Sequence, residues 1–207
     1  MANNNLFPMF LKLAGRPCLV VGAGHVGEPK IKSLIDAGAR VTTIAMTATD
    51  RVQLWAEQKR LVWHQRSFIT SDLDGVFLAI AATSSPVVNE LIFVEAQRRG
   101  VLCNSVDDPM HCDFYYGAVV RRGELQIAIS TAGQSPALAQ QLRQQLEFQF
   151  DASYGPWLAE LGRVRQHLMA SGLDAGRRKQ ILHHLANQRA SRQVQKKPIK
   201  RKAARGA

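Results

Sequence analysis

The chain has 207 residues, of which 46% are hydrophobic, and a formal net charge of +11. This length and composition favour one or two compact domains with a real hydrophobic core. No stretch approaches about 18 uninterrupted apolar residues, and the first residues lack the charged and apolar regions of a signal peptide, so we expect no membrane span and a cytoplasmic location.

The positive charge is concentrated at the end of the chain. From Arg189 onward there are eight basic residues and no acidic one, whereas the preceding part carries 19 basic and 16 acidic residues. Such a segment is typical of a solvated tail, so we expect residues 189–207 to be disordered. Because no recognition motif accompanies the charge, we expect no specific nucleic-acid partner.

The three cysteines, Cys18, Cys103 and Cys112, are widely spaced and form no C-x-x-C pair. This spacing predicts neither a zinc ribbon nor a disulfide framework, so we expect buried or half-buried thiols. The neighbouring His111-Cys112-Asp113 sequence is interpreted as structural or close to the substrate, and no metal site is expected.

Strands and helices alternate over the first half of the chain. Residues 17–22 form a short apolar run that ends in glycine, which is typical of a buried parallel strand. A helix is expected over residues 24–37, ended by Gly38. Further strands are expected at 40–45, 60–64, 75–82 and 101–106, and further helices at 50–60 and 89–99. This alternation predicts βαβ units and a parallel sheet.

The pattern changes after about residue 114. Residues 115–121 and 124–130 predict two strands around a turn at Arg122-Gly123. Ser135-Pro136 is a strong helix start, and the helix should continue to about residue 150. Residues 154–188 predict helices with a break near Gly172.

The sequence Gly22-Ala23-Gly24-His25-Val26-Gly27 matches G-x-G-x-x-G between a predicted strand and a predicted helix. Gly22 allows a tight turn, Gly24 lets the backbone approach a pyrophosphate, and Gly27 lets the helix and strand pack closely. The free N–H groups of the helix start suit the phosphates. This context predicts a Rossmann-type domain that holds NAD; the alternative is a tight turn without a ligand.

The second strand lacks the acidic residue that usually binds the adenine ribose. The strand ends with Ile44-Ala45-Met46-Thr47, so we expect Thr47 and the local backbone to bind the adenine ribose instead. Asp50 is a candidate substitute, but we expect it to lie too far along the loop. The choice between NAD and NADP therefore stays open.

Further stretches resemble one known family. Together with the glycine loop, they resemble the precorrin-2 dehydrogenase / sirohydrochlorin ferrochelatase module of siroheme synthases over about residues 5–185. The stretches are Gly38-Ala39-Arg40-Val41-Thr42, Ile80-Ala81-Ala82-Thr83, Asn104-Ser105-Val106-Asp107-Asp108-Pro109, Cys112-Asp113-Phe114, Arg121-Arg122-Gly123 and Ile129-Ser130-Thr131-Ala132-Gly133-Gln134-Ser135-Pro136.

The resemblance implies an enzyme that oxidises precorrin-2 to sirohydrochlorin with NAD⁺ in siroheme biosynthesis, and many members then insert Fe²⁺. It implies an α/β fold in four parts and a homodimer. The parts are an NAD-binding Rossmann domain at 1–114, a small α+β dimerisation segment at 115–150, a helical domain at 151–188 and the basic tail at 189–207.

The resemblance also implies roles for individual residues. Asp107 is expected to be the acid/base group, because it follows a predicted strand end, where open α/β sheets bind ligands; the alternative is a turn residue. We expect substrate contacts at Ser130, Thr131 and Ser135, whose helix start suits a substrate with many carboxylates. The residues expected to bind NAD are Gly22, Gly24, His25, Val26, Gly27, Met46, Thr47 and Thr83.

Two departures from the family pattern, together with the basic tail, leave a second hypothesis open. Pro29 stands where arginine is common, and Ser84-Ser85 replaces an acidic pair. The rival is an NAD-binding sensing or assembly module without turnover. A short-chain dehydrogenase is disfavoured, because no tyrosine is followed four residues later by lysine.

Overall fold

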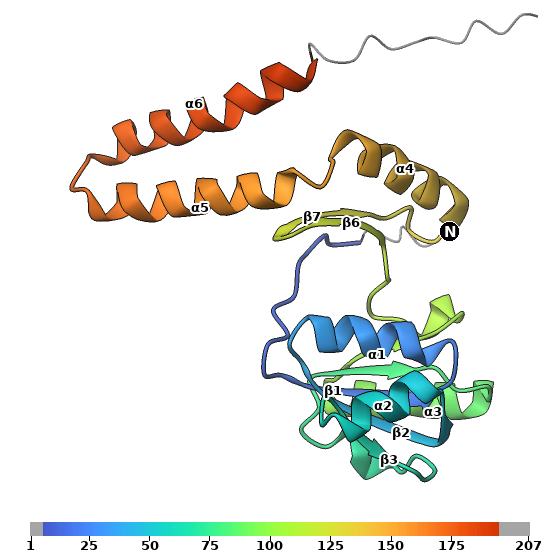
Figure 1. Cartoon of the computed structure of the whole chain (residues 1–207). Helices are drawn as coiled ribbons and strands as arrows, with labels where there is room; N and C mark the ends of the chain where they lie inside the picture. The colour runs from blue at the N-terminus through green and yellow to red at the C-terminus, as the bar shows by residue number, and fades with distance from the viewer. Residues whose placement is uncertain (1–5, 195–207) are drawn as a thin grey trace, which may run out of the picture. The chain divides into compact units, whose positions relative to one another are not determined.

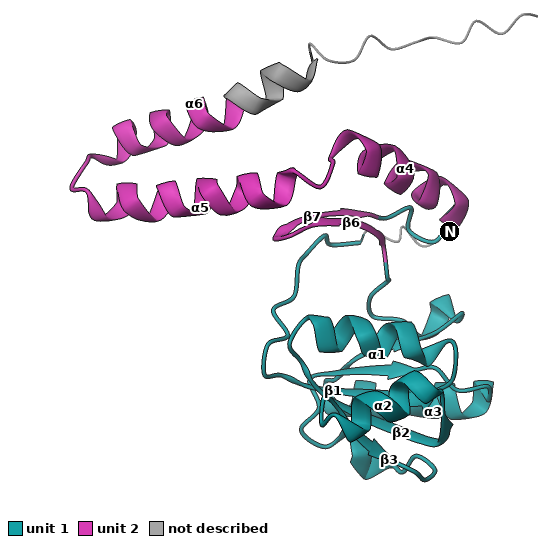
Figure 2. Cartoon of the chain, in the orientation of Figure 1, with its two compact units in different colours: residues 1–116, 130–135 teal, residues 117–129, 136–207 magenta. Residues whose placement is uncertain are grey.

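The computed structural model describes residues 6–194 of a chain that divides into two compact units. Unit 1 comprises Met1–Tyr116 and Ser130–Ser135, and unit 2 comprises Gly117–Ile129 and Pro136–Ala207 (Figure 2). None of the helices in the described range is long and apolar enough to cross a membrane.

A five-stranded parallel sheet forms the centre of unit 1, in the order β3-β2-β1-β4-β5. The predicted parallel sheet is therefore confirmed. From β1 the chain proceeds to β2 on one side and later to β4 on the other, so the strand order reverses beside β1. Ligands bind at such a reversal in open α/β sheets. The strands are β1 (Pro17–Ala23), β2 (Arg40–Ala48), β3 (Val62–His64), β4 (Leu78–Ala81) and β5 (Leu102–Ser105).

Helices cover both faces of this sheet (Figure 1). Successive strand residues point to opposite faces. Val20 accordingly packs in one buried cluster with Ile31 of α1 and Val52 of α2, whereas Leu19 packs in the other with Ile92 of α3. The helices are α1 (Gly27–Asp36), α2 (Asp50–Glu57) and α3 (Pro86–Arg99).

Two helices begin at different residues than the sequence predicts, and each difference has a local cause. The expected start of α1 at Gly24 is wrong by three residues, because the preceding residues form the glycine turn, with the Glu28 amide bonded to the Gly24 carbonyl at 2.9 Å. The expected start of α3 is three residues late. Ser85 caps this helix by accepting the Val88 amide, and Pro86 occupies the first position.

The expected strand at 75–82 is too long at its beginning. Gly75 has φ +72°, and the Val76 amide bonds to the Leu73 carbonyl at 3.2 Å, so this segment still belongs to the turn after the short 3₁₀ helix η1 (Thr70–Leu73). In contrast, β2 continues to Ala48, three residues further than expected.

Unit 2 contains the hairpin and the helices that the sequence predicts. β6 (Ala118–Arg122) and β7 (Leu125–Ile129) pair in antiparallel register. The helices are α4 (Pro136–Gln149), α5 (Tyr154–Ala170) and α6 (Ala175–Val194). Helix α6 continues past residue 189, where we expected the basic tail to begin; residues 195–207 lie outside the described residues.

The side chain of Arg122 ties the hairpin to the end of α4. Its Nε donates to the Phe150 carbonyl at 2.7 Å, and its Nη2 donates to the Glu147 carbonyl at 3.1 Å. The last carbonyls of a helix lack partners within the helix, so a guanidinium stabilises them both as a donor and as a positive charge. Arg122 therefore has a structural role.

We predict that Arg122→Met lowers the free energy of unfolding by about 1–3 kcal/mol, because it removes two charge-assisted hydrogen bonds from half-buried carbonyls. Chemical denaturation followed by circular dichroism measures this loss. The matched control is Arg121→Met, since Arg121 is exposed and adjacent. Equal stability of the two variants would contradict the structural role of Arg122.

The pair of Asp72 and Arg66 gives a pH-dependent contribution to stability. The Asp72 side chain is 10% exposed, and it accepts from Arg66 Nη1 at 2.8 Å and from the Ile69 amide at 3.0 Å. The hydrogen bond from Arg66 holds the pKa of Asp72 below its usual value. A carboxyl with a lowered pKa stabilises the fold above its unfolded-state pKa, and this stabilisation is lost as the pH falls through the native pKa.

We therefore predict that Asp72→Asn destabilises the protein by about 1 kcal/mol at about pH 7, and that the difference from the unsubstituted protein disappears below about pH 3. Denaturation curves at both pH values measure it. Asp74→Asn is the control, because the Asp74 side chain is 67% exposed in its pair with Arg99. A difference that persisted unchanged in acid would be inconsistent with this titration.

Candidate functional site

Two glycines of the turn between β1 and α1 have no room for a side chain, one because of the residue after β4 and the other because of the turn itself. A Cβ on Gly22 would lie 2.2 Å from the Ala82 carbonyl oxygen, and Gly22 has φ +102°. A Cβ on Gly27 would lie 2.1 Å from the Gly22 carbonyl oxygen. Gly24 is different, because a Cβ there would meet no protein atom within 4 Å. The fold thus needs Gly22 and Gly27, while Gly24 leaves its backbone open to a ligand.

The start of α1 presents backbone N–H groups at this open position. Val26 is the N-cap residue, and its side chain makes no capping hydrogen bond. The first N–H groups of a helix lack partners within the helix, and the helix dipole adds a partial positive charge there. Both features suit the phosphates of a dinucleotide.

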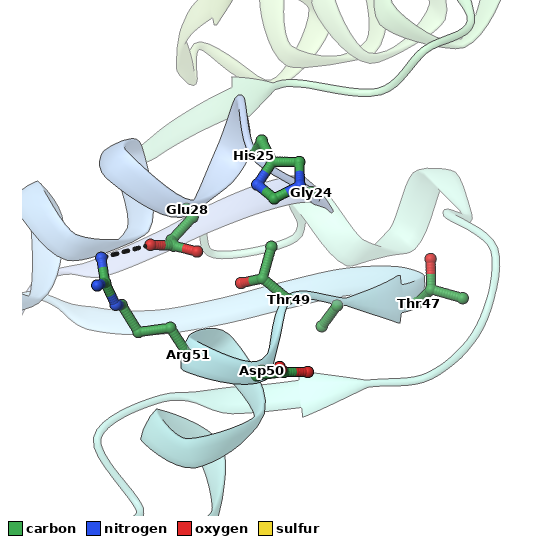
Figure 3. A pocket seen from close by; sticks show the side chains of 8 residues that line it. Gly24, His25, Glu28, Thr47, Thr49, Asp50 and Arg51 are labelled. Atoms are coloured by element: carbon green, nitrogen blue, oxygen red, sulfur yellow. Dashed lines mark hydrogen bonds and ion pairs between the residues drawn. The ribbon is translucent and has the colours of Figure 1, made fainter.

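An open pocket of about 650 Å³ lies beside the glycine turn (Figure 3). Glu28 and Arg51 face each other at one side of it and form an ion pair of 2.9 Å. This pairing offsets the negative charge that Glu28 would otherwise present to a phosphate. The lining residues are Gly24, His25, Glu28, Thr47, Ala48, Thr49, Asp50 and Arg51.

Some of the residues expected to bind NAD line this pocket and others do not. Gly24, His25 and Thr47 do, whereas Met46 is an exposed neighbour whose backbone carbonyl accepts from Gln65. Whether Asp50 can bind the adenine ribose stays a prediction, but Asp50 also lines this pocket. The reason is that β2 extends to Ala48, which brings the start of α2 back toward the glycine turn.

Sequence reasoning missed four other lining residues, Glu28, Ala48, Thr49 and Arg51. Thr49 is the N-cap of α2 and accepts the Val52 amide. A threonine followed by an acidic residue before a helix is a recognisable start signal, and it could have found this end of the pocket. No spacing rule predicts the ion pair of Glu28 with Arg51.

The end of β4 is fixed by a buried asparagine. Thr83 donates its hydroxyl to Asn89 Oδ1 at 2.7 Å, and its amide donates to the same oxygen at 3.2 Å. Asn89 Nδ2 in turn donates to the Thr83 carbonyl at 3.1 Å, and Asn89 is 8% exposed. We expected the Thr83 hydroxyl to contact the cofactor, but it is hydrogen-bonded to Asn89 of α3. Asn89 was missed on sequence, where its only signal is a polar residue near the helix start.

Asp107 lies at the apex of a turn that directly follows β5. It is exposed and has φ +62°, an uncommon conformation for a residue other than glycine, although aspartate tolerates it. The Asp108 amide closes the turn on the Ser105 carbonyl at 3.3 Å, and the Cys112 thiol donates to the Ser105 and Asp108 carbonyls. The carboxylate therefore projects from a braced turn at the carboxyl end of the sheet, as expected.

The three cysteines are buried or half-buried free thiols, as expected. Burial raises the pKa of Cys18 to about 11 and that of Cys103 to about 12, and it also raises the pKa of Cys112. All three thiols therefore stay protonated at neutral pH, and protonated thiols are poor nucleophiles and metal ligands.

His111 is also held in place by its neighbours. Its Nδ1 lies 2.5 Å from Asp108 Oδ2, and its ring packs edge-on against Phe93 at 5.1 Å. Within residues 6–194, no group of three histidine, cysteine or acidic side chains is arranged to hold a metal ion.

The residues expected to contact substrate form the turn before α4. Ser130 Oγ accepts the Ala132 amide at 3.1 Å, and Thr131 Oγ1 accepts the Ser135 amide at 3.3 Å. Both hydroxyls thus stabilise a turn in which Ala132 has φ +49°. Their contact with a substrate stays a prediction.

Two family models match the chain. The model described as putative NAD(P)-binding matches residues 9–118, and the model described as sirohaem biosynthesis protein central matches residues 122–148. The two matches follow one another along the chain. The first includes the glycine turn and the Asp107 turn, and the second includes β7 and nearly all of α4.

Curated relatives and a solved structure agree with these matches. Siroheme synthase 1 of Aeromonas hydrophila subsp. hydrophila is 39% identical over 80% of this chain, and siroheme synthase 2 of Klebsiella pneumoniae subsp. pneumoniae is 37% identical over 86%. The chain spans 36% and 39% of the length of these two relatives. The structure titled SirC, precorrin-2 dehydrogenase is 27% identical, with a TM-score of 0.78 over 87% of this chain and 89% of that one.

We predict that Gly24→Ala leaves the free energy of unfolding within about 1 kcal/mol of the unsubstituted value but weakens NAD⁺ binding at least about tenfold, because the added methyl occupies space for the ligand alone. Gly27→Ala should instead destabilise the fold by at least about 2 kcal/mol, because its Cβ meets backbone. Titration calorimetry and thermal unfolding separate the two effects.

The matched control for these variants is Gly162→Ala. Gly162 lies in α5, and a Cβ there would meet no atom within 4 Å. This change should preserve NAD⁺ affinity. Undiminished NAD⁺ binding by Gly24→Ala would contradict a nucleotide site at this turn.

Proposed function

The chain belongs to the precorrin-2 dehydrogenase / sirohydrochlorin ferrochelatase family, which forms the N-terminal module of siroheme synthases, and on this premise we propose that it oxidises precorrin-2 to sirohydrochlorin with NAD⁺ in siroheme biosynthesis. The observation that carries the proposal is the similarity to the SirC structure, which extends over nearly the whole of both chains. A likeness of the nucleotide-binding domain alone would support only cofactor binding.

The glycine turn fits a dinucleotide. The open backbone at Gly24 and the uncapped start of α1 would hold the pyrophosphate, with Gly22, His25, Val26 and Gly27 shaping that turn. Met46 and Thr47, at the end of β2, would lie beside the adenosine, and Thr83 at the end of β4 would lie near the nicotinamide. When bound, NAD⁺ accepts the hydride that leaves the macrocycle.

Asp107 is the residue proposed to move the proton. Oxidation of precorrin-2 removes a hydride and a proton, so the enzyme needs a base beside the ring as the hydride departs. Asp107 is exposed at the carboxyl end of β5 on a turn fixed by hydrogen bonds, and a carboxylate there would accept this proton and release it to solvent. The left-handed backbone at Asp107 is consistent with a residue kept for function.

The more detailed parts of the proposal rest on the family resemblance. Insertion of Fe²⁺ into sirohydrochlorin requires removal of pyrrole protons, which the same carboxylate would accept. Ser130, Thr131 and Ser135 are proposed to contact the carboxylates of the substrate. A homodimer formed through residues 115–150 and a cytoplasmic location complete the proposal.

The structure removes two arguments for the rival hypothesis of a sensing module without turnover. Pro29 stands in the first turn of α1, where a missing N–H costs no helical hydrogen bond. Ser85 caps α3, so the change from the acidic pair has a structural use. Neither departure touches the glycine turn or Asp107.

Anaerobic incubation of the purified protein with enzymatically generated precorrin-2 and NAD⁺ tests the proposed activity. We expect the visible spectrum of sirohydrochlorin to appear together with an equal amount of NADH. Addition of Fe²⁺ to the same sample then tests the chelatase. NAD⁺ binding without any turnover would favour the sensing module.

We predict that Asp107→Asn lowers kcat for precorrin-2 oxidation by at least about a hundredfold, because general acid–base groups contribute about 10²–10⁴ in rate. NAD⁺ affinity and stability should be preserved, since asparagine tolerates the left-handed conformation. Asp108→Asn is the matched control at the neighbouring position and should retain most of the activity. Full activity of Asp107→Asn would refute the assigned role.

A further inference from the structure

Lys30 is a cation on α1 that forms no ion pair with any acidic side chain of residues 6–194. Its half-buried ammonium lies 3.9 Å from the centre of the Tyr116 ring, which in turn contacts Phe114. In the described part of the chain, no carboxylate oxygen comes within 4.0 Å of Lys30 Nζ. Lys32, two residues further along the helix, instead pairs with Asp36 at 2.5 Å.

The Tyr116 ring supports this cation without neutralising it. Burial raises the pKa of the Tyr116 hydroxyl, so the phenol stays neutral at physiological pH. The face of a neutral aromatic ring attracts a cation but leaves its N–H groups free to donate elsewhere. Lys30 is therefore fixed in position while it keeps hydrogen-bond donors for a further partner.

Asp107 is the charged neighbour of Lys30. Burial lowers the pKa of Lys30, and the negative charge of Asp107 on the turn after β5 opposes that effect. The two charged groups are nevertheless farther apart than the 4.0 Å limit of an ion pair, so the Asp107 carboxylate does not pair with the ammonium. A half-buried positive charge kept apart from its nearest acid is costly unless a ligand uses it.

We propose that Lys30 binds a peripheral carboxylate of the tetrapyrrole next to Asp107. This inference rests on the proposed function, whose substrate is a polycarboxylate. Such a substrate is repelled by Asp107, and the ammonium of Lys30 offsets that repulsion with a charge-assisted hydrogen bond. The Tyr116 ring holds the ammonium in position, and Lys30 thereby favours carboxylated rings over esterified ones.

The equilibrium affinity for sirohydrochlorin tests the role of Lys30 without requiring turnover. Anaerobic titration followed by absorbance should show a Kd that rises about tenfold or more in Lys30→Met, which keeps the apolar stem and removes the charge. Lys30→Arg should stay within about threefold of the unsubstituted protein, because it keeps the cation over the ring. Lys32→Met is the matched control on the same helix and should leave the Kd unchanged.

Steady-state kinetics separate a binding role from a structural one. Lys30→Met should raise the KM for precorrin-2 by a similar factor with little change in kcat or NAD⁺ affinity, and raising the salt concentration should weaken binding less than in the unsubstituted protein. If Lys30→Met fails to fold, Lys30→Gln replaces it in both measurements.

The two proposals fail in different ways. An unsubstituted protein that binds sirohydrochlorin but does not oxidise precorrin-2 would overturn the proposed function alone. A folded Lys30→Met protein with unchanged Kd for sirohydrochlorin would overturn the role of Lys30 and leave the proposed function intact.

Discussion

The close approach of β1, α1 and β4 at the glycine turn is the constraint on which the site depends. A side-chain carbon at Gly22 or Gly27 would overlap a backbone oxygen, so these segments can meet only because both residues lack one. The Ala82 amide bonds to the Val21 carbonyl, and the Val106 amide bonds to the Ala81 carbonyl. The carboxyl ends of β4 and β5 are thereby held in register with the turn, and the residues that follow them are positioned by backbone contacts.

This arrangement places positive and negative groups at the carboxyl end of the sheet, and each group has a separate role. The start of α1 is open to phosphates, and the nearby Glu28 is neutralised by Arg51. Asp107 remains a free carboxylate on its braced turn, with the Lys30 ammonium held on an aromatic ring close to it. In the proposed reaction, such a site would favour an anionic dinucleotide and an anionic macrocycle, and Asp107 would be available as the base for proton transfer.

Periodicity and turn residues predicted most of the elements, because the apolar β-branched runs and the glycine stops are local signals. The same logic failed at the start of α3, where Ser85-Pro86 carries the signal that was used at Ser135-Pro136. The motif located Gly24 and the strand end located Asp107. Contacts between segments that are distant in the sequence have no such local signal. The hydrogen bonds of Asn89 with Thr83 and the stacking of Lys30 on Tyr116 depend on tertiary packing.

A crystal structure of the protein with bound NAD⁺ tests most directly whether these segments form one site. We predict that the pyrophosphate lies on the backbone at Gly24, with the nicotinamide at the ends of β4 and β5 and facing Asp107. A nucleotide bound at the glycine turn with its nicotinamide directed away from Asp107, or bound elsewhere on the molecule, would show that these segments do not form one site.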